Sequence, residues 1–281
     1  LVEKIGISLY DAKDLNKSLY IVATPIGNLN DLSSRAIEIL KQADLIAVEN
    51  TQIFRHLGID VPSQKLLHVT EHNTPRQTPK ILEMARTGIA ALTSDAGTPT
   101  ISDPGSRIVE TAHVENIPVY VIPGPSALSA SISISGFSGD THFLGFLPRK
   151  TNDRKRIIQK TAQTAKILVV YENPSRLTRT LTEIANWLND PETVVCRELT
   201  KIYEETIRNN ASVLANQIKS PRGECTVVIN SSNWPEKNHL EEASVYMQEM
   251  HRAGAKRAAA AAEAARRFSI ERKLAYSLWP D

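Results

Sequence analysis

The sequence predicts an α/β protein with two α/β domains and a small C-terminal helical appendage. Short apolar runs alternate with segments of helical period along most of the chain, which is typical of sheets covered by helices. The 281 residues are enough to bury two separate cores. Gly145 and Pro148 interrupt the pattern, and from about residue 240 the chain is alanine-rich and helical in period.

Four parts follow from these changes in pattern. A basic run begins next to Pro148, and the interruption around residues 143–150 marks the boundary between the domains. The predicted parts are an N-terminal tail at 1–17, an N-terminal α/β domain at 18–142, a C-terminal α/β domain at 143–233 and the helical appendage at 240–281.

The first domain is expected to contain five strands, each followed by a helix. Strands are predicted at residues 18–23, 44–48, 65–69, 89–94 and 118–122, and helices at 32–43, 53–58, 79–87, 106–116 and 127–135. Asp31 and Ser126 are placed to cap the first and last of these helices, because their side-chain oxygens accept bonds from free N–H groups.

The second domain repeats the pattern with fewer helices. Strands are predicted at residues 166–172, 192–199, 202–207 and 224–230, and helices at 175–188 and 211–218. Cys196 and Cys225 lie in two of these strands, and no Cys or His pairs have the short spacing of a zinc site. We expect two buried, reduced thiols and no metal.

Composition indicates a soluble protein of the cytoplasm. No segment approaches the roughly 18 consecutive apolar residues of a membrane span, and the first residues lack the layout of a signal peptide. The net charge is only +2, but positive charge gathers in residues 148–160. Such a cluster suits a phosphate backbone, and a solvated surface remains the alternative.

Three turn-rich loops follow predicted strands of the first domain. They are ATPIGNLND at 23–31, TSDAGTPTISDPG at 93–105 and IPGPSAL at 122–128. Ligands of α/β proteins bind where the carboxyl ends of strands meet, so these loops are candidates for one small-molecule site. Tight structural turns remain the alternative for each loop taken alone. Neither G-x-G-x-x-G nor G-x-x-x-x-G-K-[ST] is present, which argues against an ordinary dinucleotide fold and a P-loop.

These loops, together with GFLPRK, VYENPSRL, CRELTKIYEE and RGECTVVI, occur in the order found in ribosomal RNA small subunit methyltransferases I, of the tetrapyrrole methylase superfamily. The resemblance covers about residues 18–230. It implies two α/β domains with S-adenosylmethionine in the cleft between them, and a homodimer. It also implies 2′-O-methylation of a cytidine in the decoding region of small-subunit (16S) ribosomal RNA, as naked RNA or in the assembled subunit.

The resemblance also implies a set of site residues. The cofactor-binding residues would be Pro25, Gly97, Thr98, Pro99, Ile101, Ser126, Ala127, Tyr171, Leu199, Glu224 and Cys225. The candidate catalytic residues are the carboxylates Glu49, Asp95 and Asp103 at predicted strand ends, with Lys201 as an electrostatic aid; Asp95 or Glu49 is the hypothesised base. RNA would be bound by Arg35, Arg149, Lys150, Arg154, Lys155 and Arg156.

Two alternative functions stay open. The family's usual Asp, Arg and Glu are replaced here by Asn50, Gln52 and Thr74, which is compatible with an RNA-binding relative that has lost catalysis. A methylase of tetrapyrrole precursors would have a similar fold and cofactor cleft. The basic run favours RNA over that macrocycle, because a macrocycle needs an apolar pocket.

Overall fold

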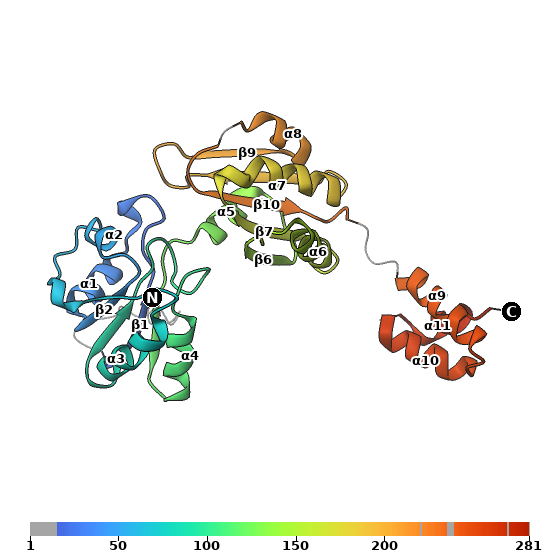
Figure 1. Ribbon diagram of the computed structural model, residues 1–281, viewed down its shortest axis with the longest axis horizontal. Helices are drawn as coiled ribbons and strands as arrows, with labels where there is room; N and C mark the ends of the chain where they lie inside the picture. The colour runs from blue at the N-terminus through green and yellow to red at the C-terminus, as the bar shows by residue number, and fades with distance from the viewer. Residues whose placement is uncertain (1–15, 220, 235–238, 269, 281) are drawn as a thin grey trace, which may run out of the picture.

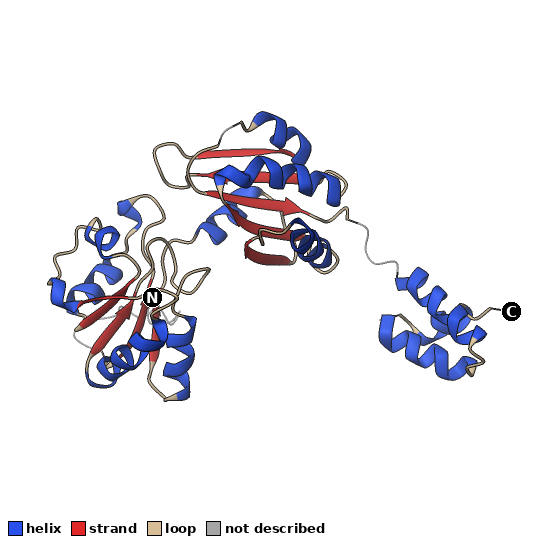
Figure 2. Cartoon of the chain, in the orientation of Figure 1, coloured by secondary structure: helices blue, strands red, loops and turns tan. Residues whose placement is uncertain are grey.

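Two five-stranded sheets, each with its own helices, form the body of the molecule (Figure 1). The computed structural model describes residues 16–219, 221–234, 239–268 and 270–280. The predicted tail therefore lies outside the described residues except for its last two. The three C-terminal helices form a separate unit (Figure 2). The expected fold class is confirmed.

The first sheet is parallel throughout, with strand order β3-β2-β4-β1-β5. Its strands are β1 (Ser18–Val22), β2 (Leu45–Val48), β3 (Leu66–His68), β4 (Ile89–Leu92) and β5 (Val119–Ile122). Its helices are α1 (Ser34–Gln42), α2 (Thr51–Arg55), α3 (Thr74–Thr87) and α4 (Ser106–Val114). Alternate residues of β1 face opposite sides, so that Leu19 packs with α3 and α4 and Tyr20 packs with α1 and α2.

The second sheet is mixed, with strand order β6-β7-β10-β8-β9. Its strands are β6 (Thr141–Phe146), β7 (Ile167–Glu172), β8 (Glu192–Arg197), β9 (Glu205–Asn210) and β10 (Cys225–Asn230). Only β6 and β7 are parallel. The helices α6 (Thr151–Ala162), α7 (Pro174–Trp187) and α8 (Ala211–Gln217) pack against one face.

Helix α5 (Ala127–Ser135) lies on the other face of the second sheet. Leu128 and Ala130 pack there against Val169 and Val228, although α5 follows a strand of the first sheet. The chain thus passes between the two units in the turn before α5. The boundary that the sequence places at residues 142–143 falls within β6.

The C-terminal unit consists of α9 (His239–Arg252), α10 (Arg257–Phe268) and α11 (Arg272–Ser277). Small and sulphur-bearing side chains make its core, among them Ala243, Met247, Ala261 and Ala264, which are fully buried. The predicted helical appendage is confirmed.

Several predicted elements differ in their bounds. The first-domain helix at 32–43 is capped by Ser33, whose side chain accepts a bond from the Ala36 N–H, while Asp31 ends a 3₁₀ turn. Helix α3 starts at Thr74 because Pro75, and not Pro79, occupies its first turn. Strand β9 begins at Glu205, three residues later than predicted.

The sequence analysis missed two elements, β6 and α6. The interruption at Gly145 is a bulge in a strand and not an interdomain break, since β6 changes register against β7 between Phe143 and Gly145. The basic run folds as α6, whose buried residues Arg154 and Ile158 lie one turn apart.

Arg154 is the largest fully buried side chain of the described residues. Its Nε and Nη2 donate to the two carboxylate oxygens of Glu183 at 2.8 and 2.7 Å. Its Nη1 donates to the carbonyl oxygens of Pro148 and Arg149. A charged guanidinium with 2% exposure depends on this partner, because a buried ion without one is strongly unfavourable.

We predict that Glu183→Ala lowers the free energy of unfolding by about 3–5 kcal/mol, because it leaves the Arg154 charge buried and unpaired. The measurement is urea unfolding. Arg179→Ala is the matched control: its guanidinium also bonds Glu183 but is 64% exposed, and its loss is expected to cost at most about 1 kcal/mol. Equal losses in the two variants would contradict the prediction.

Candidate active site

The loops that follow β1 and β4 are joined by two backbone hydrogen bonds. Thr24 N–H donates to the Gly97 carbonyl at 2.9 Å, and Gly97 N–H donates to the Thr24 carbonyl at 3.1 Å. The Thr98 hydroxyl donates to the carbonyl of Pro125, in the turn after β5, at 3.2 Å. Three loops that are distant in sequence therefore form one surface at the carboxyl end of the first sheet.

The loop after β4 has an unusual backbone. Gly97 has φ +84°, a conformation open to glycine, and a Cβ there would lie 3.2 Å from the Ile26 side chain. Thr100 and Ser102 adopt φ values of +71° and +68°, which residues with a Cβ rarely do. Strain of this kind gathers at ligand sites, where the surrounding structure holds it.

The second unit closes against these loops. Ile26 packs among Val169, Val194 and Leu199 of the second sheet and the loop after β8. Gly27 is tight against the same loop, since a Cβ there would lie 2.3 Å from Lys201 Cγ and 2.9 Å from the Leu199 carbonyl oxygen. The β1 loop is thus fixed in the second unit by one apolar side chain and one glycine.

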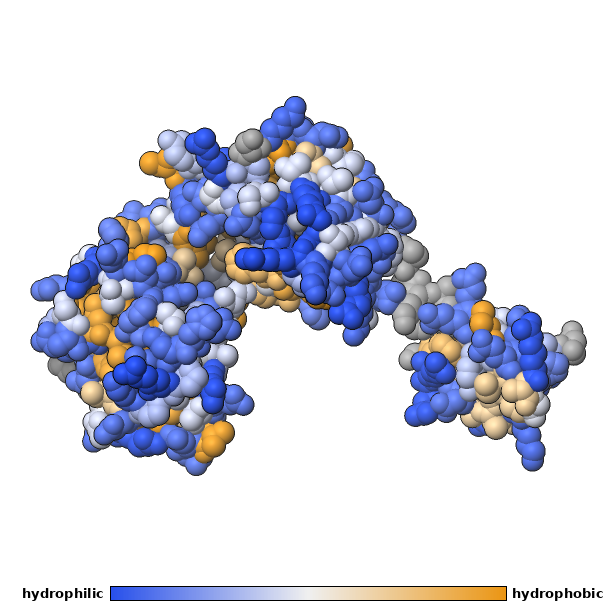
Figure 3. Space-filling model, in the orientation of Figure 1, coloured by the Kyte–Doolittle hydropathy of each residue, from blue (hydrophilic) through white to orange (hydrophobic). Residues whose placement is uncertain are grey.

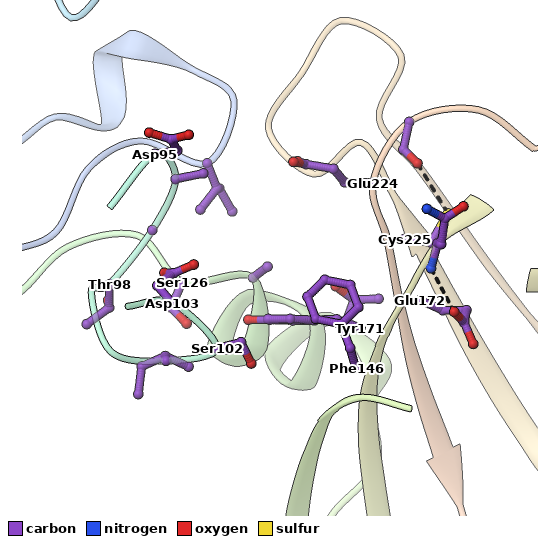
Figure 4. A pocket seen from close by; sticks show the side chains of 18 of the residues that line it. Asp95, Thr98, Ser102, Asp103, Ser126, Phe146, Tyr171, Glu172, Glu224 and Cys225 are labelled. Atoms are coloured by element: carbon purple, nitrogen blue, oxygen red, sulfur yellow. Dashed lines mark hydrogen bonds between the residues drawn. The ribbon is translucent and has the colours of Figure 1, made fainter. Parts of the chain in front are cut away.

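Between the two units lies a cavity of about 390 Å³. This volume is within the range of small-molecule sites. Figure 4 shows Asp95, Asp103 and Ser126 on the side of the first unit, with Tyr171, Phe146 and Glu224 opposite them. The lining residues are Ile26, Glu49, Asp95, Ala96, Gly97, Thr98, Ile101, Ser102, Asp103, Ser126, Ala127, Phe146, Tyr171, Glu172, Asn173, Pro174, Gly223, Glu224, Cys225 and Thr226.

Three carboxylates share the first-unit wall of this cavity. Burial, with a contribution from Glu49, raises the pKa of Asp103 to about 6. Burial also raises the pKa of Glu49, and the charge of Asp95 adds to that rise. The pKa of Asp95 is raised by burial as well. A wall of partly desolvated acids favours a cationic ligand and supplies bases for proton transfer.

Comparison with known proteins agrees with this geometry. The family described as tetrapyrrole (corrin/porphyrin) methylases matches residues 18–215. The chain belongs to the tetrapyrrole methylase family. It is 39% identical to ribosomal RNA small subunit methyltransferase I of Thermotoga maritima over 220 residues, which cover 75% of this chain and 97% of that one. It is 35% identical to the Synechocystis sp. protein of the same name over 271 residues, 92% and 96% of the two chains.

Two solved structures share the fold. Uroporphyrin-III C-methyl transferase from Thermus thermophilus, complexed with S-adenyl homocysteine, has a TM-score of 0.55 and 18% identity, over 76% of this chain and 97% of that one. Diphthine synthase has a TM-score of 0.56 and 12% identity, over 75% and 88%. With its close relatives, the chain is a methyltransferase of the S-adenosylmethionine-dependent class.

Most of the predicted cofactor residues line the cavity of this methylase. They are Gly97, Thr98, Ile101, Ser126, Ala127, Tyr171, Glu224 and Cys225. Pro25, Pro99 and Leu199 are not among the lining residues, because all three are buried in the loops that shape it. Ser126 precedes α5 as predicted, but its side chain makes no capping bond.

Glu49, Asp95 and Asp103 are brought together, whereas Lys201 is not with them. The Lys201 ammonium donates to Glu198 Oε1 and Glu224 Oε2, each at 2.9 Å, and it does not line the cavity. Lys201 contacts the site through Glu224, which lines the cavity.

The predicted RNA-binding residues divide between surface and interior. Arg35, Arg149, Lys150, Lys155 and Arg156 are exposed. In one view of the molecule the surface over α6 and α7 is largely hydrophilic (Figure 3). The prediction that Arg154 binds RNA was wrong, because Glu183 and two carbonyl oxygens hold its guanidinium inside the second unit.

Several second-unit residues of the site were not predicted from the sequence. Phe146 and Glu172 are the last residues of β6 and β7, Asn173 follows β7, and all three line the cavity. The motifs GFLPRK and VYENPSRL contain them, so those motifs were the available signal.

Two of the three departures from the family pattern have a local explanation. Asn50 caps α2, its side chain accepting bonds from the N–H groups of Gln52 and Ile53. Thr74 is buried at the start of α3 and donates to the Thr70 carbonyl at 2.7 Å. Neither lines the cavity.

The two cysteines lie in buried strands of the second sheet, β8 and β10. Cys196 and Cys225 are free and buried, as predicted, and burial raises the pKa of each thiol to about 11. In the described part of the chain there is no group of side chains suited to a metal ion. Nor does any described helix have the length and apolar character to cross a membrane.

We predict that Asp103→Asn raises the melting temperature by a few degrees at pH 7–8. The pKa of Asp103 is about 6 when folded and near 3.8 when unfolded, so above pH 6 the folded protein holds a disfavoured charge that the amide lacks. Below about pH 4 the carboxyl is protonated in both states, and the difference disappears.

Thermal unfolding followed between pH 4 and pH 8 makes this measurement. The exposed Asp60→Asn is the control, for which no such pH-dependent gain is expected. A gain for Asp103→Asn that is largest at low pH would contradict the assigned direction of the pKa shift.

Proposed function

We propose that this chain transfers a methyl group from S-adenosylmethionine to the ribose 2′-oxygen of a cytidine in the decoding region of small-subunit (16S) ribosomal RNA. The observation that carries the proposal is its identity of 35–39% to ribosomal RNA small subunit methyltransferases I over almost their full length. The proposed active form is a homodimer, as the resemblance implies, and its proposed location is the cytoplasm, as the composition indicates.

The residues of the cavity fit the cofactor. Ala96 and Gly97 leave room along the first-unit wall, and Ala127 does so at the start of α5, because their side chains are small or absent. The sulfonium and ammonium groups of the cofactor are cations, which the three carboxylates favour. When bound, the cofactor supplies an electrophilic methyl group for an in-line displacement.

Asp103 is the carboxylate best suited to act as the base. A ribose hydroxyl is a poor nucleophile while it keeps its proton, and a nearby base removes it. With a pKa of about 6, the Asp103 carboxyl is largely ionised at neutral pH and is a stronger base than an ordinary aspartate. Glu49 and Asp95, the bases hypothesised from sequence, then keep the cavity anionic and raise the basicity of Asp103.

Positioning supplies the rest of the expected rate enhancement. Well-oriented intramolecular reactions reach effective molarities of about 10⁵–10⁸ M. The Thr24–Gly97 bonds and the Gly27 contact fix the two sides of the cavity relative to one another. The reacting groups therefore need little reorganisation once they are bound.

The alternative of a tetrapyrrole-precursor methylase is disfavoured by charge. Such macrocycles carry several carboxylates, which Glu49, Asp95 and Asp103 would repel. The alternative of a non-catalytic RNA-binding relative is not supported by the position of Asn50 and Thr74, which serve local structure outside the cavity.

We predict methyl transfer to small ribosomal subunits that lack the modification, with 2′-O-methylcytidine as the product. The measurement is incorporation of labelled methyl followed by mass spectrometry of the nucleosides.

Asp103→Asn should lower kcat by about 10²–10⁴ through loss of the base. Full turnover by Asp103→Asn would show that Asp103 is not the base. If the wild-type protein binds the cofactor in calorimetry but transfers no methyl group, the non-catalytic relative is favoured instead.

RNA binding should weaken steeply as salt is added, because exposed cations release counterions from phosphates. Each phosphate contact contributes about 0.7 to the slope of log K against log salt for single-stranded nucleic acid. The double variant Arg149→Ala/Lys150→Ala should therefore lower the slope by about 1.4. An unchanged slope would contradict the assignment of these two residues.

A further inference from the structure

Phe146 is an aromatic residue at the mouth of the active-site cavity. It is the last residue of β6, it lines the cavity, and 63% of its surface is exposed. Figure 4 shows it next to Tyr171 on the second-unit side, facing the loop that carries Ser102 and Asp103. A large apolar side chain this exposed at the edge of a polar site is suited to contact a ligand.

The bulge in β6 aims this ring. In a regular strand Phe143 and Phe146 would face opposite sides of the sheet, because side chains alternate. The register shift between Phe143 and Gly145 inserts one extra residue, so both rings lie against Tyr171, with centroids at 4.8 and 5.6 Å. Gly145 has φ +60° and approaches Ser102 of the first unit.

Two guanidinium groups donate hydrogen bonds to the backbone of residues 147–149, which follow Phe146. Arg176 donates to the carbonyl oxygens of Leu147 and Pro148 at 3.1 and 3.3 Å. Arg154 donates to those of Pro148 and Arg149 at 3.0 and 2.6 Å. Phe146 is therefore followed by backbone that one buried and one partly exposed guanidinium hold in place, so the ring is positioned before any ligand arrives.

Cations follow this ring in the sequence, and acids line the cavity that it borders. Arg149 and Lys150 follow on the exposed side, and the carboxylates of the first unit line the inner cavity. A single nucleotide of an RNA matches this order, since its phosphates suit the cations and its ribose hydroxyl needs the base. Its nucleobase then requires an apolar surface between them, and aromatic rings provide such surfaces for unstacked bases.

We propose that Phe146 is a substrate-positioning residue whose ring stacks on the base of the nucleotide to be methylated. This inference rests on the proposed function for the identity of the nucleotide. Stacking on Phe146 sets how deeply the ribose enters the cavity, and Tyr171 holds the ring from behind.

The test compares Phe146→Ala, Phe146→Leu and Phe146→Trp. For each variant the affinity for unmodified small ribosomal subunits is measured by filter binding, KM and kcat by methyl incorporation, and the affinity for S-adenosylmethionine by calorimetry. Phe146→Ala and Phe146→Leu should raise Kd and KM for the subunits about tenfold, within the range of one lost stacking contact. Phe146→Trp should keep both near the wild-type values, and cofactor affinity should stay within twofold throughout.

Tyr120→Ala is the matched control. Tyr120 is also an exposed aromatic residue whose ring contacts another ring, but it lies on β5 outside the cavity lining, so no change is expected. Wild-type Kd and KM in Phe146→Leu would overturn the proposal, because apolar bulk alone would then suffice. So would an equal loss of cofactor affinity in Phe146→Ala, which would place the ring on the cofactor, or a change of oligomeric state in that variant.

Failure of the proposed function gives a different result. If the wild-type protein binds subunits with an affinity that depends on Phe146 but transfers no methyl group, the stacking role stands and the reaction assignment fails. If methyl transfer proceeds and Phe146→Ala leaves Kd and KM unchanged, the reaction stands and the stacking role fails.

Discussion

The pair of backbone hydrogen bonds between Thr24 and Gly97 is the constraint on which the active site depends. It joins the loop after β1 to the loop after β4, and the second position has φ +84°, a conformation that favours glycine. From the first loop Ile26 and Gly27 meet the second unit. From the second loop come Asp95 and Asp103. One local pairing thus fixes both the cleft between the units and the acids inside it.

Burial and the clustering of acids raise the pKa of Asp103, which suits it to the proposed role of base. Isolated in water, Asp103 would have a pKa near 3.8 and little tendency to take a proton at neutral pH. Burial in the cavity, with Glu49 close by, raises it to about 6. The same charges make the cavity suitable for a cationic cofactor. Bringing these carboxylates together lowers the stability of the fold. The same site contains strained backbone at Thr100 and Ser102.

The basic run after β6 shows how one stretch of sequence serves two purposes. Arg154 points inward and, with Arg176, fixes the carbonyl groups of residues 147–149. Arg149 and Lys150 point outward, where they are available to phosphates. A rigid segment of this kind lets surface cations and the Phe146 ring act from defined positions, with less conformational entropy lost on binding.

The two α/β units, most strand and helix positions, and the loops that form the site could be predicted from the sequence, because apolar periodicity and turn residues are local signals. The carboxylates Glu49, Asp95 and Asp103 could also be selected as candidate bases, since each lies in a segment that follows a predicted strand. The folded structure was needed to show that these three meet in one cavity, that Arg154 is buried against Glu183 29 residues away, and that β6 contains a bulge and not a domain boundary. These features depend on contacts between segments far apart in the chain, which no local pattern encodes.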